Sequence, residues 1–125
     1  MAPGSDIGER FDARCAVIGA GAAGLAAGKA LAARGISFEI FEGADTVGGM
    51  WQIDSPQSAA YETLTLNSSR AMTQFRCFPM PKAWPDFITY RYMADYLESF
   101  ADEFGLRDQI HLGTWVESVE PVPGP

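Results

Sequence analysis

The sequence predicts an α/β fold with a parallel sheet, and three consecutive patterns support it. Residues 15–19, CAVIG, form a short apolar run that ends at glycine, which is typical of a strand buried on both faces. Residues 22–34 are rich in alanine and leucine and stop at Gly35, as a helix does. Residues 36–42, ISFEIFE, are β-branched and aromatic and indicate a second strand. Together they form a βαβ unit, for which we expect a right-handed crossover.

Three further elements are predicted after this unit. Residues 61–66 alternate between polar and apolar side chains and indicate a short strand. Residues 90–104 have the apolar spacing of an amphipathic helix, which Gly105 ends. The apolar positions of this helix are Met93, Tyr96, Leu97, Phe100 and Phe104. Residues 110–116 alternate again and indicate another strand.

A proline-rich segment in front of the amphipathic helix predicts an ordered loop. Proline lacks a backbone N–H and restricts the residue before it, so the segment can be neither regular helix nor central strand. The prolines are Pro79, Pro81 and Pro85. The same segment carries Phe75, Phe78 and Trp84, whose large apolar side chains we expect to be buried.

Length and composition predict one globular domain and argue against several kinds of partner. A chain of 125 residues with a hydrophobic fraction of 47% can bury one core. The net charge of −7, with no basic cluster, argues against a nucleic acid or an anionic membrane as partner. The apolar run at residues 15–28 is too short to span a bilayer. We expect residues 1–12 to be a flexible lead-in rather than a signal peptide, and residues 13–125 to form the domain.

The cysteines and the histidine do not predict a metal site. Cys15 and Cys77 are far apart in the sequence, and His111 is the single histidine, so the ligand spacing of a zinc site is missing. Two isolated thiols suit a reducing compartment, and we expect the protein to be cytoplasmic. No pattern in the sequence indicates an oligomeric state.

A glycine-rich loop between the first strand and the helix predicts a dinucleotide-binding site. The sequence GAGAAG follows a predicted strand and opens a predicted helix, which is the context that gives this motif its meaning. Gly19 would make the tight turn, Gly21 would let a pyrophosphate approach the backbone, and Gly24 would let the helix pack closely on the strand. The helix N-terminus would then bind the phosphates. The loop residues expected to contact the cofactor are Gly19, Ala20, Gly21, Ala22, Ala23 and Gly24.

The simplest alternative for this motif is a small-residue helix packed tightly on a sheet, with no ligand. The position of the motif between a predicted strand and a predicted helix argues against it. An acid at the end of the second strand then indicates which dinucleotide would bind. Glu42 lies 23 residues beyond Gly19, near the roughly 20 expected of an acid whose carboxylate accepts hydrogen bonds from a ribose. Such a carboxylate repels a 2′-phosphate, so we expect the adenosine of FAD or NAD and not that of NADP. Glu39 is predicted to lie in the middle of the strand, where its side chain could not reach the crevice. We expect it to be a polar residue at a locally exposed position.

Several stretches in a fixed order extend this Rossmann-like pattern to a known family. They are GAGAAGL, FEGADTVGGMW, TLTLNSSRAMTQFRCFPMP, YMADYLESFADEFGL and IHLGTWVESV. Over residues 13–119 the chain resembles the N-terminal part of the flavin-containing monooxygenases, including the related Baeyer–Villiger group. The resemblance implies that the chain is an incomplete, N-terminal FAD-binding fragment of a flavoprotein with two dinucleotide-binding domains.

The resemblance also implies roles for residues that the glycine loop does not include. Gly49 lets the chain pass close to FAD, and Met50 and Trp51 contact it. Asn67 is implied to lie beside the isoalloxazine and the nicotinamide, as a catalytic residue, with Leu66 and Ser68 flanking it in contact with the cofactors. Without the resemblance, Trp51 would be a core aromatic residue and Asn67 an ordinary turn residue after a strand. Cys77 stands where the family commonly has an acid, and nothing in the sequence explains the exchange.

For function, the resemblance implies an NADPH-dependent flavin monooxygenase. NADPH would reduce FAD, O₂ would add to give a flavin C4a-hydroperoxide, and a small molecule with a soft nitrogen or sulfur centre would be oxygenated. The alternatives are a Baeyer–Villiger enzyme that acts on a ketone, or a dinucleotide-binding module or truncated fragment without activity. We expect the NADPH site to lie outside these 125 residues, and the chain alone to be poorly stable and inactive.

Overall fold

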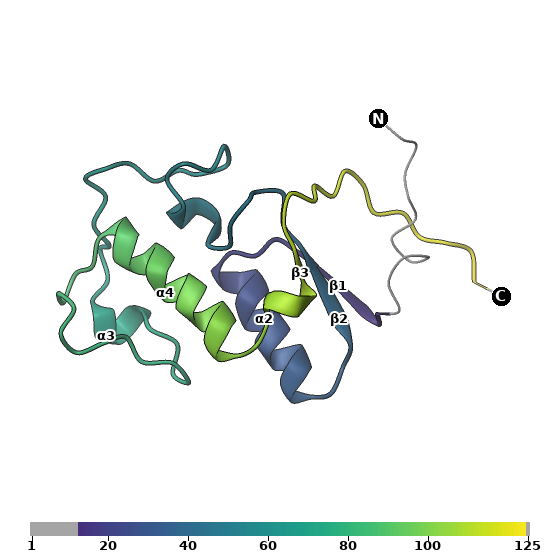
Figure 1. Cartoon of the computed structure of the whole chain (residues 1–125), viewed down its shortest axis with the longest axis horizontal. Coiled ribbons are helices and arrows are strands. Elements are labelled where there is room, and N and C mark those ends of the chain that lie inside the picture. The colour runs from purple at the N-terminus through teal and green to yellow at the C-terminus, as the bar shows by residue number, and fades with distance from the viewer. Residues whose placement is uncertain (1–12, 125) are drawn as a thin grey trace.

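The computed structural model describes residues 13–124, so the predicted lead-in at residues 1–12 lies outside the described part. A small parallel sheet lies at one side of the molecule, α2 packs against it, and α4 runs beside α2 (Figure 1). The long loop that carries α3 lies beyond α4 (Figure 1). The elements are β1 (Cys15–Ile18), α2 (Ala22–Ala33), β2 (Phe38–Phe41), η1 (Gly49–Trp51), α3 (Arg70–Thr73), α4 (Tyr90–Glu103), η2 (Arg107–Gln109) and β3 (Ile110–His111).

The predicted βαβ unit is confirmed. β1 and β2 are parallel neighbours, with Cys15 opposite Phe38, and β3 adds to the other side of β2, also in parallel. The strands are shorter than the sequence pattern suggested, but hydrogen bonds continue past their ends. The amide of Gly19 donates to the carbonyl of Phe41 at 2.8 Å, and the amide of Glu42 donates to the carbonyl of His111 at 2.9 Å.

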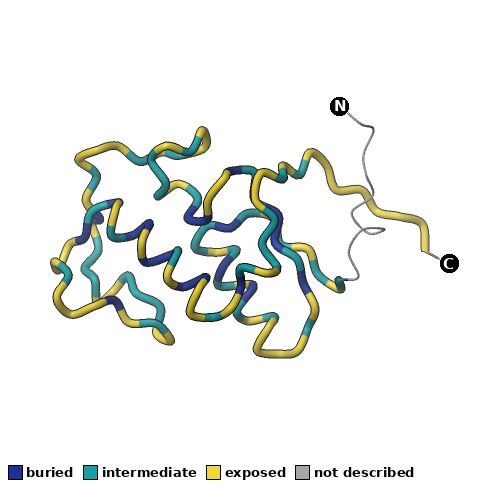
Figure 2. Tube along the Cα trace, in the orientation of Figure 1, coloured by how far each residue is buried: buried dark blue, intermediate teal, exposed yellow. Residues whose placement is uncertain are grey.

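Helix α2 lies very close to the sheet because its inner face carries small residues. A side chain at Gly28 would bring a Cβ within 2.9 Å of the Cδ1 atom of Ile40 and within 3.2 Å of the Phe38 ring. Leu25 on the same helix and Ile40 on β2 are both fully buried. Figure 2 shows that the buried residues follow the contact between α2, α4 and the sheet.

The predicted amphipathic helix is confirmed as α4. Four of the five predicted apolar positions are buried: Met93, Tyr96, Leu97 and Phe100. Phe104 is the C-cap residue and is half-buried, and Gly105 ends the helix with a φ of +63°. No helix in residues 13–124 combines the length and the apolar character that a membrane crossing requires.

Two predicted strands are wrong, in whole or in part. Residues 61–66 form no strand, and only an isolated antiparallel bridge joins Thr65 to Thr89. The residues opposite are the last ones before α4, so there is no extended partner long enough for a ladder. Of residues 110–116, only the first two are in β3. Gly113 has a φ of +58°, which turns the chain out of the sheet.

The proline-rich loop is ordered by aromatic packing against α4, as predicted. Phe75 and Phe78 stack on Tyr96, with ring centroids 6.1 and 5.3 Å away. The Tyr96 hydroxyl accepts a hydrogen bond from the amide of Phe75 at 2.9 Å and donates one to the carbonyl of Phe78 at 2.5 Å. Phe75, Phe78 and Trp84 are half-buried against the core rather than fully enclosed.

These contacts predict that the Tyr96 hydroxyl stabilises the fold and that this stabilisation is lost at alkaline pH. Burial is the main reason that the pKa of Tyr96 is raised above its ordinary 10.0; the hydrogen bond from Phe75 lowers it and nearby Cys77 raises it. The unfolded chain therefore releases this proton at lower pH than the folded chain, so stability falls as pH rises through and above about 10. We expect Tyr96→Phe to cost about 1–2 kcal/mol at neutral pH and to weaken this alkaline dependence.

Urea unfolding of the Tyr96→Phe variant between pH 7 and 11 measures both effects. Tyr61→Phe is the matched control, because the Tyr61 side chain is exposed. Equal alkaline slopes for wild type and Tyr96→Phe would show that this hydroxyl does not link stability to pH.

Candidate dinucleotide-binding site

The glycine loop after β1 requires glycine at two positions, one because of its backbone conformation and the other because of the space around it. Gly19 has a φ of +97°, which favours glycine whatever space surrounds it. A Cβ on Gly24 would lie 1.8 Å from the carbonyl oxygen of Gly19, so even alanine is excluded unless the loop moves. Ala20, between them, is fully buried. The close packing of helix and strand predicted for Gly24 is therefore present.

The N-terminus of α2 can accept an anion. Its N-cap residue, Gly21, is extended and has no side chain to cap the helix, and no acidic residue lies in the first turn. The first amides of a helix have no partner within the helix, and the helix dipole places positive charge there. A phosphate at this end would be held by the amides of Ala22 and Ala23 and by the dipole.

Glu42 lies directly after β2, beside the end of β1, where the sequence placed it. One carboxylate oxygen accepts a hydrogen bond from the amide of Ala20 at 2.9 Å, and the other accepts one from the amide of Ala44 at 2.9 Å. The side chain is half-buried. Each carboxylate oxygen has two lone pairs, so both oxygens keep capacity for a ribose hydroxyl.

Glu39 differs from the prediction of a polar residue at a locally exposed position. Its carboxylate lies 2.6 Å from the Nε2 atom of His111, and the Glu39 side chain is only 23% exposed. His111 also stacks on Phe41, with ring centroids 5.4 Å apart. Glu39 therefore joins β2 to β3, on a different part of the sheet from the glycine loop.

The second glycine pair packs directly on the first glycine loop. Gly48 and Gly49 have φ values of +118° and +58°. The amide of Gly48 donates to the carbonyl of Ala20 at 2.9 Å, and a Cβ on Gly49 would lie 3.2 Å from the Cα atom of Gly21. These glycines are thus needed for the contact between the two loops, in addition to any space they leave for a ligand. Met50 and Trp51 follow in η1, with Met50 exposed and Trp51 half-buried against the core.

A larger cavity of about 440 Å³ lies beside η1. Trp51, Leu66, Asn67 and Ser68 line it together, and these are residues to which the family resemblance assigns cofactor contacts. Asn67 is exposed, whereas Leu66 is buried. The Ser68 hydroxyl lies 2.6 Å from the hydroxyl of Thr73, and this hydrogen bond connects the segment that carries Asn67 to α3. The volume is within the roughly 300–1,000 Å³ of pockets that enclose a ligand.

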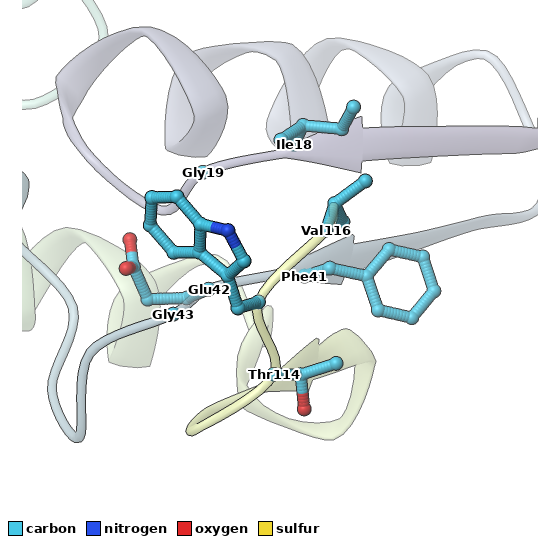
Figure 3. A pocket seen from close by; sticks show the side chains of 8 residues that line it. Ile18, Gly19, Phe41, Glu42, Gly43, Thr114 and Val116 are labelled. Atoms are coloured by element: carbon cyan, nitrogen blue, oxygen red, sulfur yellow. The ribbon is translucent and has the colours of Figure 1, made fainter. Parts of the chain in front are cut away.

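A second, smaller pocket of about 140 Å³ contains residues that sequence reasoning missed. It lies between the end of β1, the end of β2 and the segment after β3 (Figure 3). The missed residues are Ile18, Phe41, Gly43, Thr114, Trp115 and Val116. Thr114, Trp115 and Val116 fall in residues 110–116, whose alternation predicts a continuous strand, whereas the turn at Gly113 places them beside Glu42. Figure 3 shows the Glu42 carboxylate on one side of this pocket and the side chains of Ile18 and Phe41 on the other.

The described residues do not form a metal centre. In residues 13–124, no three side chains of the metal-binding types His, Cys, Asp and Glu come together. Cys15 is half-buried and Cys77 is exposed, and both are free thiols.

The chain is similar to flavin monooxygenases in sequence and in structure. The family model described as flavin-binding monooxygenase-like matches residues 12–124. Flavin-containing monooxygenase 5 of Oryctolagus cuniculus is 36% identical over 114 residues, which are 88% of this chain and 21% of that protein. The S-allyl-L-cysteine S-oxygenase from Allium sativum superimposes with a TM-score of 0.72 and 29% identity, over 79% of this chain and 27% of that one.

A third similar protein is a cyclohexanone monooxygenase variant from Rhodococcus sp. Phi1, bound to NADP⁺ in its solved structure. It has a TM-score of 0.69 and 28% identity, over 81% of this chain and 19% of that one. The chain thus spans about a fifth of the length of the curated relative and a fifth to a quarter of these structures.

The packing at Gly24 predicts that a larger residue will destabilise the site. Gly24→Ala should gain up to about 1 kcal/mol from helix propensity. The Cβ would overlap a backbone carbonyl that cannot rotate away, and overpacking of this kind costs about 1–3 kcal/mol or more. We therefore expect a net loss of stability in urea unfolding. Gly124→Ala is the matched control because its Cβ meets nothing within 4 Å; a Gly24→Ala variant more stable than wild type would contradict the packing.

Proposed function

Because the chain belongs to the flavin-binding monooxygenase-like family, we propose that it is the FAD-binding part of an NADPH-dependent flavin monooxygenase. The observation that carries the proposal is the position of Glu42. Its carboxylate is held at the glycine loop by the amides of Ala20 and Ala44, beside the uncapped N-terminus of α2. An acid suited to a ribose and a helix end suited to phosphates are thus adjacent, which supports the binding of an adenine dinucleotide.

In this proposal, FAD would extend from Glu42 along the two glycine loops to the pocket beside Asn67. The adenosine ribose would be bound by Glu42, and the pyrophosphate by the loop from Gly19 to Gly24. Gly49, Met50 and Trp51 would contact the part between pyrophosphate and flavin, since η1 is packed on the glycine loop. The cavity beside Trp51 and Asn67, with Leu66 and Ser68, is large enough for a ring system.

For the chemistry, the chain supplies binding, orientation and protection from water. When bound, FAD would supply oxygen activation with electrons from NADPH. Asn67 would stand beside the reacting ring, where an amide both donates and accepts hydrogen bonds. Trp51 and Leu66 would exclude water from the same cavity. The NADPH site is proposed to lie outside this chain, and the two free thiols suit a cytoplasmic enzyme.

The proposed substrate is a small molecule with a soft nitrogen or sulfur nucleophile. The similarity to an S-oxygenase supports this choice. A Baeyer–Villiger enzyme that oxygenates a ketone is the second candidate, supported by the similarity to a cyclohexanone monooxygenase. Product analysis with a tertiary amine, a thioether and a cyclic ketone separates the two. A binding module without activity would retain FAD but consume no O₂ with NADPH.

Glu42→Ala should lower the retention of FAD when it is introduced into the full-length monooxygenase that we propose contains this chain. The variant loses the hydrogen bonds to ribose, worth roughly 1–3 kcal/mol, so the Kd for FAD should rise about 5-fold to 150-fold. The measurement is flavin absorbance per protein after purification, together with a titration of the apoprotein. Glu103→Ala, at an exposed position at the end of α4, is the control. Wild-type flavin content in a folded Glu42→Ala protein would rule out this ribose contact.

Asn67→Ala should leave FAD bound but reduce the fraction of NADPH used for product. Asn67 is exposed to the cavity region rather than buried in the core, so its loss should not disturb folding. We expect product per NADPH to fall several-fold, with hydrogen peroxide rising to match. Gln57→Ala, in an exposed loop, controls for surface changes. Unchanged coupling would show that Asn67 has no part in the reaction.

A further inference from the structure

The indole of Trp115 lies at the mouth of the small pocket beside Glu42, and no part of the proposed function uses it. The side chain is 65% exposed, whereas most other aromatic side chains in the described residues are buried or half-buried. Four neighbours in this pocket are Ile18, Phe41, Glu42 and Val116. An exposed aromatic face beside a carboxylate, at the carboxyl ends of parallel strands, lies where open α/β sheets bind ligands.

Backbone hydrogen bonds hold the segment that carries Trp115 in register with Glu42. The amide of Gly113 donates to the carbonyl of Ala44 at 2.9 Å, and the amide of Thr114 donates to the carbonyl of Glu42 at 2.8 Å. The left-handed turn at Gly113 directs the chain into this pairing. Trp115 is therefore held beside the acid rather than on a free tail.

Gly43 provides the space that the indole occupies. A Cβ on Gly43 would lie 2.4 Å from the Cε3 atom of Trp115, 3.1 Å from Cζ3 and 3.5 Å from Cδ2. The six-membered ring of the indole thus covers the backbone immediately after Glu42. Any side chain at position 43 would displace the ring, so the position of the Trp115 indole requires glycine at position 43.

We propose that the indole of Trp115 is the stacking surface for the adenine base of the cofactor whose ribose Glu42 binds. This inference rests on the proposed function. The base is attached to the ribose, so a ribose at Glu42 brings adenine to the residues around that acid. The pocket volume of about 140 Å³ is below the roughly 300–1,000 Å³ of whole-ligand pockets and suits one ring system. The apolar side chains of Ile18 and Val116 complete an environment for a flat base.

The test uses ADP and pyrophosphate as probes. They are added to the full-length monooxygenase that we propose contains this chain, after its flavin has been removed. ADP carries the base, ribose and phosphates, whereas pyrophosphate carries the phosphates alone. We expect Trp115→Ala to weaken ADP binding about tenfold, the size that loss of one base–aromatic stack produces. Pyrophosphate binding should stay within twofold of wild type. Trp115→Phe should recover most of the ADP affinity, because a smaller aromatic face remains.

Two further variants separate stacking from general disruption. Gly43→Ala should weaken ADP binding like Trp115→Ala, because its Cβ displaces the indole. Trp84→Phe is the control. Trp84 lies in the proline-rich loop and packs on Tyr92 of α4, so this substitution should leave ADP binding unchanged. Isothermal titration gives the affinities, and circular dichroism confirms that each variant is folded.

The outcomes distinguish this inference from the proposed function. A wild-type protein that binds neither ADP nor pyrophosphate would overturn both. ADP binding that is equal in wild type and Trp115→Ala would overturn the stacking role and leave the proposed function standing. Equal losses for ADP and pyrophosphate would show that Trp115 only supports the fold, which also overturns the inference.

Discussion

The hydrogen bonds accepted by the Glu42 carboxylate hold the candidate site together. One oxygen binds the glycine loop through the amide of Ala20, and the other binds the turn after β2 through the amide of Ala44. Hydrogen bonds from backbone amides to a carboxylate are charge-assisted and stronger than neutral ones. The acid therefore positions the loop that would bind phosphates before any ligand arrives, and it does so with lone pairs left over for a ribose.

A continuous series of contacts runs from this acid to the far cavity. Ala20 accepts a hydrogen bond from Gly48, and Gly48 in turn accepts one from the amide of Trp51, which borders the cavity that contains Asn67. The side chain of Gln52 donates to the carbonyl of Val47 and to Glu98 on α4, which fixes η1 against the helical layer. An extended dinucleotide with a ring system at each end matches a site with two pockets joined by glycine-rich backbone.

Small residues make this arrangement possible, and they do so by different means. Gly19, Gly48 and Gly49 are needed for positive φ values. Gly24 is needed because a backbone carbonyl occupies the position of its Cβ, and Gly43 because an indole does. A motif of glycines in the sequence is thus a set of separate steric requirements, each of which a single alanine substitution can test.

Local patterns in the sequence are sufficient to predict the βαβ unit, α4, the glycine loop and the position of Glu42 at the end of β2. Helical and strand periodicity, glycine stops and the count from Gly19 to Glu42 all depend on neighbouring residues, so a single sequence contains them. Asn67 and Trp51 required resemblance to a family, because nothing local distinguishes them from a turn residue and a core residue.

Tertiary structure alone decided the remaining features. The failure of residues 61–66 to form a strand depends on the lack of a partner long enough to pair with them. The pairing of Glu39 with His111 joins residues 72 positions apart, and the indole of Trp115 covers a glycine that no periodicity connects to it. Such contacts depend on how strands and turns are placed in space, and residues distant in the sequence carry no local signal of the approach.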